Sequence, residues 1–224
     1  KGETIGDYLS ADSFMDIMLK RFEERNIKFY TTFNVFFISS LVNEMNADIQ
    51  KIKSGEETYN SVDKDNKVYI KSWVHHPPMF NPLHPKVKKV IMGFVKEIAD
   101  RYSYSPAFGG ITFHLNMPQP MFYGSLDISY DDWTINEFEK DTGIKIPVDK
   151  KDPERFSKRY SWLIENNRQK WTAWRCEKIT GYYKELAEIL RSKRSDLELV
   201  VNILEPVMPV MDEQRSKWIK GEKK

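Results

Sequence analysis

The segment 81–116 constrains the fold of this chain more than any other part of its sequence. It predicts a loop, a long amphipathic helix over 84–102 and a short apolar strand over 110–116. Apolar residues recur along the helix at spacings of three and four residues, which places them in one stripe on a single face. Gly109 and Gly110 then lead into the strand. A helix that delivers the chain into a buried strand is half of a βα repeat, and such repeats build parallel sheets.

The rest of the chain shows the same alternation of helical and strand patterns. The predicted helices cover 12–25, 40–53, 84–102, 131–141 and about 154–193, and the predicted strands cover 28–37, 67–74, 110–116 and 197–204. Because strands alternate with helices, we expect an α/β fold with a parallel sheet. A complete (β/α)8 barrel has eight strands in roughly 250 residues. The chain therefore fits either an open sheet or part of a barrel, with a helical excursion at about 117–195.

Charge and composition exclude several classes of partner. The 224 residues include 35 basic and 33 acidic side chains, so the net charge is only +2. Such a balance gives no basic face for binding nucleic acid. No apolar run approaches the roughly 18 residues of a membrane span, and no nucleotide or other cofactor fingerprint is present. We therefore expect no nucleic-acid partner, no membrane span and no cofactor.

Cysteine content and the first residues bear on the origin of the chain. Cys176 is the single cysteine, so neither an intrachain disulfide nor a cysteine metal site is expected. The sequence begins Lys-Gly-Glu, without an initiator Met or a signal peptide. We expect a mature form or a fragment from which any targeting segment is missing.

Three segments together resemble the (β/α)8 glycoside hydrolases of the large retaining clan, and in particular the family-42 β-galactosidase-like catalytic domain and related uncharacterised glycosidase-like barrels. The segments are NPLHPKVKKVIMGFVKEIADRY with FGGITFHLN, YDDWTINEFEKDTGIKIP, and RYSWLIENNRQKWTAWRCEKITGYYKELAEILRSKRSDLELVVN, which span about 80–204. The resemblance implies that residues 1–224 form a single TIM-type barrel domain or a fragment of one. It also implies a carbohydrate ligand, hydrolysis of glycosidic bonds through paired carboxylates, and a secreted or periplasmic location.

The chain departs from the pattern of that clan at one important position. The resemblance places strand 4 of the clan, which ends in Asn-Glu with the Glu as general acid/base, at Asn116 and Met117. Asn116 matches, but Met117 stands where the Glu is expected. The nucleophile of the clan lies on a later strand that this chain does not show. Two hypotheses follow: a carbohydrate-active hydrolase, or a non-catalytic carbohydrate-binding or structural barrel. A third is an unrelated α/β enzyme that uses His114 as a base.

Two carboxylates of this chain are candidates for catalysis, and the alternative is that one of them acts with a second carboxylate that lies outside the chain. Glu205 follows the predicted strand 197–204 and precedes a proline, which suits an acid or base at a strand end. Asp127 lies in the loop before the helix 131–141 and is the other candidate. Asp131 and Asp132 fit better as caps of that helix. Either candidate could equally be a solvated loop residue.

The candidates for sugar binding lie on or just after predicted strands. His114 and Asn116 alternate along one strand, so their side chains point the same way. Trp73 and His75 alternate likewise near the end of the strand 67–74, where an indole face suits the apolar face of a pyranose. The binding set is completed by Asn34 and Asn202. For the polar members the alternative is burial with hydrogen bonds to neighbouring strands, and for Trp73 it is a place in the core. No metal ligand set is expected.

Overall fold

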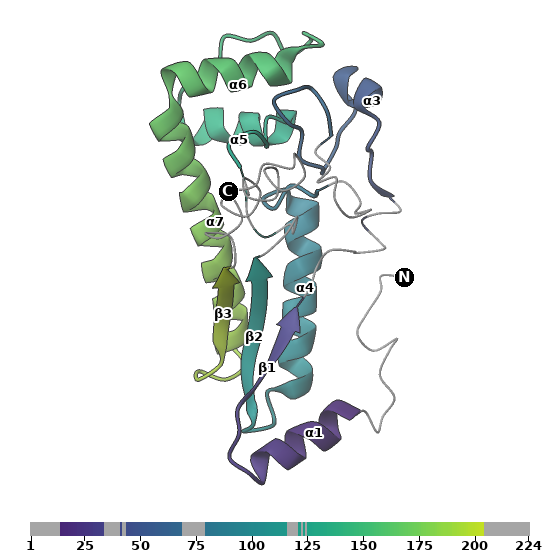
Figure 1. The fold of residues 1–224 in the computed structure, drawn as a ribbon, viewed down its shortest axis with the longest axis vertical. Coiled ribbons are helices and arrows are strands. Elements are labelled where there is room, and N and C mark those ends of the chain that lie inside the picture. The colour runs from purple at the N-terminus through teal and green to yellow at the C-terminus, as the bar shows by residue number, and fades with distance from the viewer. Residues whose placement is uncertain are drawn as a thin grey trace, which may run out of the picture.

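In the described part of the chain, a three-stranded parallel sheet lies in the lower half of the molecule, beside α1, α4 and α7 (Figure 1). Strand β1 (Phe29–Phe33) pairs with β2 (Phe108–Leu115), and β2 pairs with β3 (Glu198–Ile203), so β2 lies in the centre. The computed structural model describes residues 14–33, 41, 44–68, 79–115, 121, 123 and 125–203. Three of the predicted strands are therefore present and run parallel, as the βα alternation indicated.

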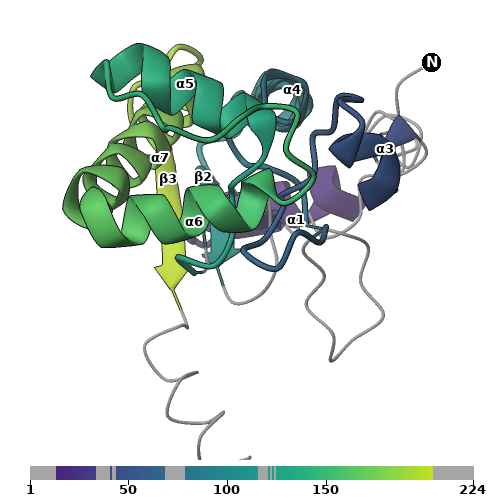
Figure 2. The same cartoon turned by 90° about the horizontal axis from the view of Figure 1, so that it is seen from above.

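Helices surround the sheet on one face and at both ends. Helices α4 and α7 lie behind the sheet, α1 lies at its amino end, and α3, α5 and α6 lie beyond its carboxyl end (Figures 1 and 2). Their bounds are Phe14–Glu23 for α1, Ile49–Lys53 for α3, Pro85–Tyr102 for α4, Asp132–Thr142 for α5, Arg155–Asn166 for α6 and Arg168–Arg191 for α7. None of the helices in the described part of the chain combines the length and the apolar character needed to cross a membrane.

Helix α4 forms where the apolar stripe predicted it. His84 caps its first turn by accepting the Lys86 backbone N–H at Nδ1, and Pro85 occupies the first turn, where a missing N–H costs nothing. The stripe then packs against β2 and α7 in the larger core. Its fully buried members are Val87, Ile91, Val95, Ile98 and Ala99. Helix α4 therefore owes its position to burial of one face.

The two faces of β2 have different environments. Ile111, Phe113 and Leu115 are buried in the core that α4 and α7 cover. Thr112 and His114, which alternate with them, are only half-buried. The neighbouring strands are in register, so Val200 and Asn202 of β3 share the second face with them. No helix in the described ranges covers this second face, which we call the open face.

Close contact between β2 and β3 depends on a glycine. Gly110 has φ +141°, a conformation that other residues rarely adopt, and a Cβ placed there would lie 2.0 Å from the Glu198 carbonyl oxygen. A side chain at this position would force the strands apart. The glycine that the sequence placed before the strand is thus part of the sheet itself.

The prediction of one continuous helix over 40–53 is confirmed at its two ends and wrong in the middle. Leu41 and Glu44 are helical, residues 45–48 are not, and α3 covers the last five residues. The Asn46 carbonyl oxygen accepts hydrogen bonds from Thr58 Oγ1 at 2.8 Å and Asn60 Nδ2 at 2.9 Å instead of a helical amide. Asp48 then caps the new helix by accepting the Gln50 backbone N–H. Tertiary hydrogen bonds therefore override the local periodicity.

The predicted strand 67–74 does not lie between the first and third predicted strands. Strand β1 pairs directly with β2, which leaves no place for a strand between them. Val68 instead forms an isolated antiparallel bridge with Val62, and residues 69–74 lie outside the described residues. Four parallel strands in chain order are thus not formed. The described sheet is compatible with part of a glycosidase-like barrel, but it is not a complete one.

Candidate functional site

The carboxyl edge of the open face brings together two of the predicted binding residues. His114 on β2 and Asn202 on β3 are register partners, and Asn202 Nδ2 lies 3.4 Å from His114 Nδ1. His114 is half-buried and Asn202 is exposed, so both side chains are accessible. An imidazole beside an amide offers several donors and acceptors to a ligand with hydroxyl groups.

The other binding candidates and one catalytic candidate lie outside the described residues. They are Trp73, His75, Asn116, Asn34 and Glu205. In the chain, Glu205 follows the end of β3 at Ile203 by two residues. Their roles stay predictions.

Asp127 lies in the region beyond the carboxyl end of the sheet. Its backbone N–H donates to Ser125 Oγ at 3.0 Å, and its carbonyl oxygen accepts the Lys64 backbone N–H at 2.8 Å. The segment is held further by the antiparallel bridge between Asp63 and Ile128. These contacts fix the backbone of Asp127, whereas its carboxylate forms no hydrogen bond with the described residues. Within the described ranges, Asp127 makes no hydrogen bond or ion pair with His114 or Asn202.

Asp131 caps α5, as the sequence predicted, and is completely buried. Its Oδ1 accepts the Thr134 backbone N–H at 2.9 Å, and both carboxylate oxygens lie 3.2 Å from Asn81 Nδ2. Burial raises the pKa of Asp131 to about 6, although the hydrogen bonds from Thr134 act in the opposite direction. Asp131 is therefore a structural carboxylate whose charge is costly.

Asp132 turns away from Asp131 and joins two buried arginines. Arg155 binds it in a fork, with Nε to Oδ1 at 2.9 Å and Nη2 to Oδ2 at 2.8 Å, and Arg159 Nη1 lies 2.7 Å from Oδ1. Arg155 also donates to the carbonyl oxygens of Ile52 and Lys53 at the end of α3. This cluster ties α3, α5 and α6 together beyond the strand ends.

His84 is a buried histidine that the sequence analysis did not single out. It lies between the rings of Tyr59 and Trp133, with centroid distances of 5.9 and 5.5 Å. Its Nε2 is 3.3 Å from Glu57 Oε1, yet burial lowers the His84 pKa. A neutral imidazole that caps α4 at Nδ1 and donates at Nε2 satisfies both contacts. Within the described residues, no group of three or more His, Cys, Asp or Glu side chains is arranged to hold a metal ion.

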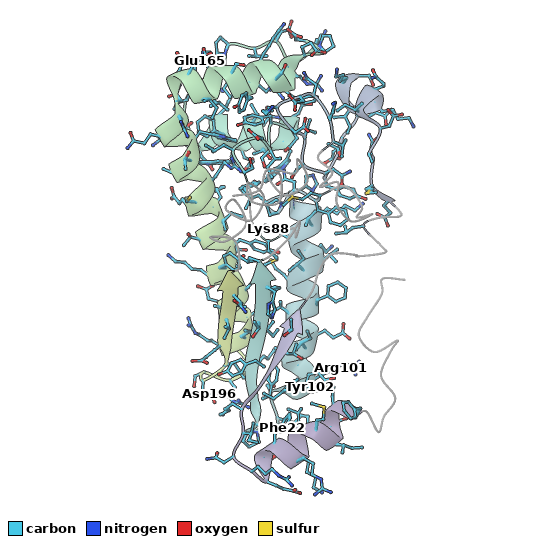
Figure 3. The ribbon with its side chains drawn as sticks, viewed as in Figure 1. Phe22, Lys88, Arg101, Tyr102, Glu165 and Asp196 are labelled. Carbon is cyan, nitrogen blue, oxygen red and sulfur yellow. The ribbon has the colours of Figure 1, made fainter. Side chains whose placement is uncertain are left out.

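A groove lies on the outer surface, between α4, α5 and α7 and away from the open face. It has a volume of about 900 Å³ and is lined by side chains of both charges. Lys88 of α4, labelled in Figure 3, pairs across it with Glu185 of α7 at 2.8 Å. Because cations and carboxylates neutralise one another there, the groove has no clear preference for a ligand.

Comparison with known proteins places the chain in a family. The family model described as "Glycosyl hydrolase-like 10" matches residues 4–212, and the chain therefore belongs to that family. No curated protein and no solved structure matches it. The match confirms the resemblance to glycosidase-like proteins. It does not extend to the family-42 assignment or to the retaining clan.

Proposed function

We propose that this member of the glycosyl hydrolase-like 10 family hydrolyses glycosidic bonds and binds its sugar at the carboxyl edge of the parallel sheet. The observation that carries the proposal is the His114–Asn202 pair on the open face, in a chain of a glycosidase-like family. In α/β folds, ligands bind at the carboxyl ends of parallel strands. The half-buried imidazole of His114 and the exposed amide of Asn202 suit the hydroxyl groups of a sugar ring.

Sugar binding draws on further residues in this proposal. Trp73 stacks on the sugar, and His75, Asn116 and Asn34 contribute hydrogen bonds. The open face belongs to the inside of a TIM-type barrel of which this chain supplies part. The support is the one-sided packing of the sheet, since barrel strands carry helices only on the outside.

Hydrolysis requires two carboxylates, for which we propose Glu205 and Asp127. One carboxyl group protonates the leaving oxygen, while the other attacks the sugar or activates water. Glu205 follows β3, the strand that carries Asn202, and Asp127 lies on a backbone fixed beyond the strand ends. A separation of about 5–5.5 Å between the two carboxyl groups gives retention of configuration, and about 6.5–9.5 Å gives inversion.

A second candidate function is carbohydrate binding without catalysis. The observation that favours it is Met117 at the position where the resemblance expects the acid/base Glu. A barrel that has lost this group keeps its sugar contacts and loses most of its rate, because general acid–base help contributes about 10²–10⁴-fold.

The test is an assay on aryl glycosides and oligosaccharides with the protein and three variants. Glu205→Gln and Asp127→Asn remove the proposed carboxylates, and Glu165→Gln removes an exposed carboxylate on α6 as a matched control (Figure 3). We expect turnover that falls by at least about 10²-fold in each of the first two variants and is unchanged in the control. Turnover that survives both replacements would show that other residues catalyse. Sugar binding without turnover in the unmodified protein would support the second candidate.

A further inference from the structure

Arg175 of α7 is a buried cation that has no carboxylate partner among the described residues. Its side chain is almost completely enclosed, with only 4% of the residue exposed. Nη2 donates to the Ser125 carbonyl oxygen at 2.7 Å, but the buried Nη1 finds no hydrogen-bond partner in the described part of the chain. Burial lowers the Arg175 pKa, and no carboxylate in the described ranges is among the charges that act on it. This differs from Arg155 and Arg159, which share Asp132.

Aromatic rings compensate the charge only in part. The Tyr123 ring lies 4.3 Å from the Arg175 guanidinium carbon, and the Trp171 ring lies 5.5 Å from it. These contacts hold the guanidinium plane and attract its charge. They supply no acceptor for Nη1, because a ring face does not replace an anionic oxygen. A buried donor left unpaired is costly, so the site favours an acceptor.

A pocket lies directly against this arginine. It has a volume of about 390 Å³ and lies between α7 and the residues Tyr123, Ser125 and Leu126. Its lining is mainly uncharged, and Arg175 supplies the positive charge. The lining residues are Tyr123, Ser125, Leu126, Thr172, Arg175, Cys176 and Ile179. The volume is in the range of small-molecule sites.

We propose that this pocket binds the anionic group of a small ligand, a carboxylate, sulfate or phosphate, with Arg175 as its cationic anchor. A planar guanidinium matches such oxyanions through paired N–H donors. The Nη1 atom is buried, so the adjacent Tyr123 or Ser125 shifts when the anion enters. The proposal is independent of glycoside hydrolysis and is tested by binding alone.

The first experiment is a titration of the protein with acetate, glucuronate, sulfate and inorganic phosphate, each against sodium chloride of equal ionic strength. The variant Arg175→Leu removes the anchor, and Arg191→Leu removes the same charge from an exposed position on the same helix. We expect saturable binding of at least one oxyanion to the protein and to the control variant. We expect affinity at least about tenfold weaker in Arg175→Leu, the loss of one charged hydrogen-bonding group.

The relative affinities identify the source of the anionic group. Glucuronate that binds more tightly than acetate indicates an acidic sugar, while preference for sulfate or phosphate indicates an esterified ligand. No saturable binding beyond that of chloride would overturn the proposal, and so would equal binding to Arg175→Leu.

A second measurement covers the case in which Arg175→Leu does not fold. Arg175→Lys keeps the charge but loses the fork, and Cys176 at the pocket is exposed and reports occupancy through its rate of alkylation by N-ethylmaleimide. We expect the preferred anion to slow alkylation of Cys176 in the unmodified protein. In Arg175→Lys, we expect the same slowing to require an anion concentration about tenfold higher. An alkylation rate that no anion changes would contradict the site.

Discussion

Asp131 should make the protein less stable as the pH rises from about 4 to about 7.5. Its carboxyl group is fully buried, and its pKa of about 6 in the folded protein compares with 3.8 for an ordinary Asp. A raised pKa means that the folded state holds the proton more tightly than the unfolded chain does. The stabilisation is complete below about pH 3.8 and is lost as the pH passes through about 6. A shift of about two pKa units corresponds to about 3 kcal/mol.

The variant Asp131→Asn isolates this contribution from other titrating groups. Asparagine keeps an oxygen for the Thr134 backbone N–H but carries no charge. Urea unfolding, followed by circular dichroism at several pH values, gives the free energy of unfolding for both proteins. We expect the difference, variant minus unmodified protein, to rise by about 3 kcal/mol across this pH window. The exposed-site variant Glu165→Gln should show no comparable trend.

A difference that stays constant with pH would refute this reasoning. It would mean that Asp131 titrates as an ordinary carboxyl group, and hence that water reaches it. A fall in the difference would be equally contradictory, because it would require an Asp131 pKa below 3.8 in the folded protein.

Three further predictions concern stability. Arg155→Met removes one of the two arginines that bind Asp132, and the last carbonyl oxygens of α3 lose the donor that Arg155 supplies. In urea titrations, the free energy of unfolding should therefore fall by about 2–4 kcal/mol. Gly110→Ala places a methyl group against the Glu198 carbonyl oxygen, and it should prevent β2–β3 pairing, seen as lost near-UV circular dichroism. Gly93→Ala in α4 meets no atom within 4 Å, and it should stabilise the protein by about 0.5–1 kcal/mol. Equal behaviour of the two glycine variants would contradict the close approach of the strands.

The elements with strong periodicity could be predicted from the sequence. The apolar stripe of 84–102 and the apolar runs of 28–37, 110–116 and 197–204 correspond to α4, β1, β2 and β3. These segments bury a continuous face, so local pattern and tertiary packing agree. The helical region predicted at about 154–193 forms α6 and α7, and Trp171 and Trp174 of α7 lie in the core.

The secondary-structure predictions failed where contacts between distant segments determine the backbone conformation. Nothing local in 40–53 shows that the Asn46 carbonyl oxygen is bonded by Thr58 and Asn60. Likewise, the apolar run of 67–74 satisfies a strand pattern, but the direct pairing of β1 with β2 leaves it no place between them. Strand order depends on pairing between distant segments, which periodicity does not report.

The candidate site could be predicted only in part. Alternation within each strand, together with the barrel rule, selected His114 and Asn202, and parallel register places them side by side. Arg175 was missed because a charged residue in an amphipathic helix normally faces water. The burial of Arg175 depends on Tyr123 and Ser125, and Ser125 precedes Arg175 by 50 residues in the chain.

The most direct test of sugar binding at the carboxyl edge is calorimetry with short β-linked galacto- and gluco-oligosaccharides. His114→Ala and Asn202→Ala alter the proposed site. Tyr30→Phe is the control, because it alters the same sheet at its amino end, where the Tyr30 hydroxyl donates a hydrogen bond to Glu198. We predict affinity about tenfold weaker in the first two variants, as for loss of one or two hydrogen bonds, and unchanged in the third. Equal affinity in all three variants, or no sugar binding by the unmodified protein, would contradict the account.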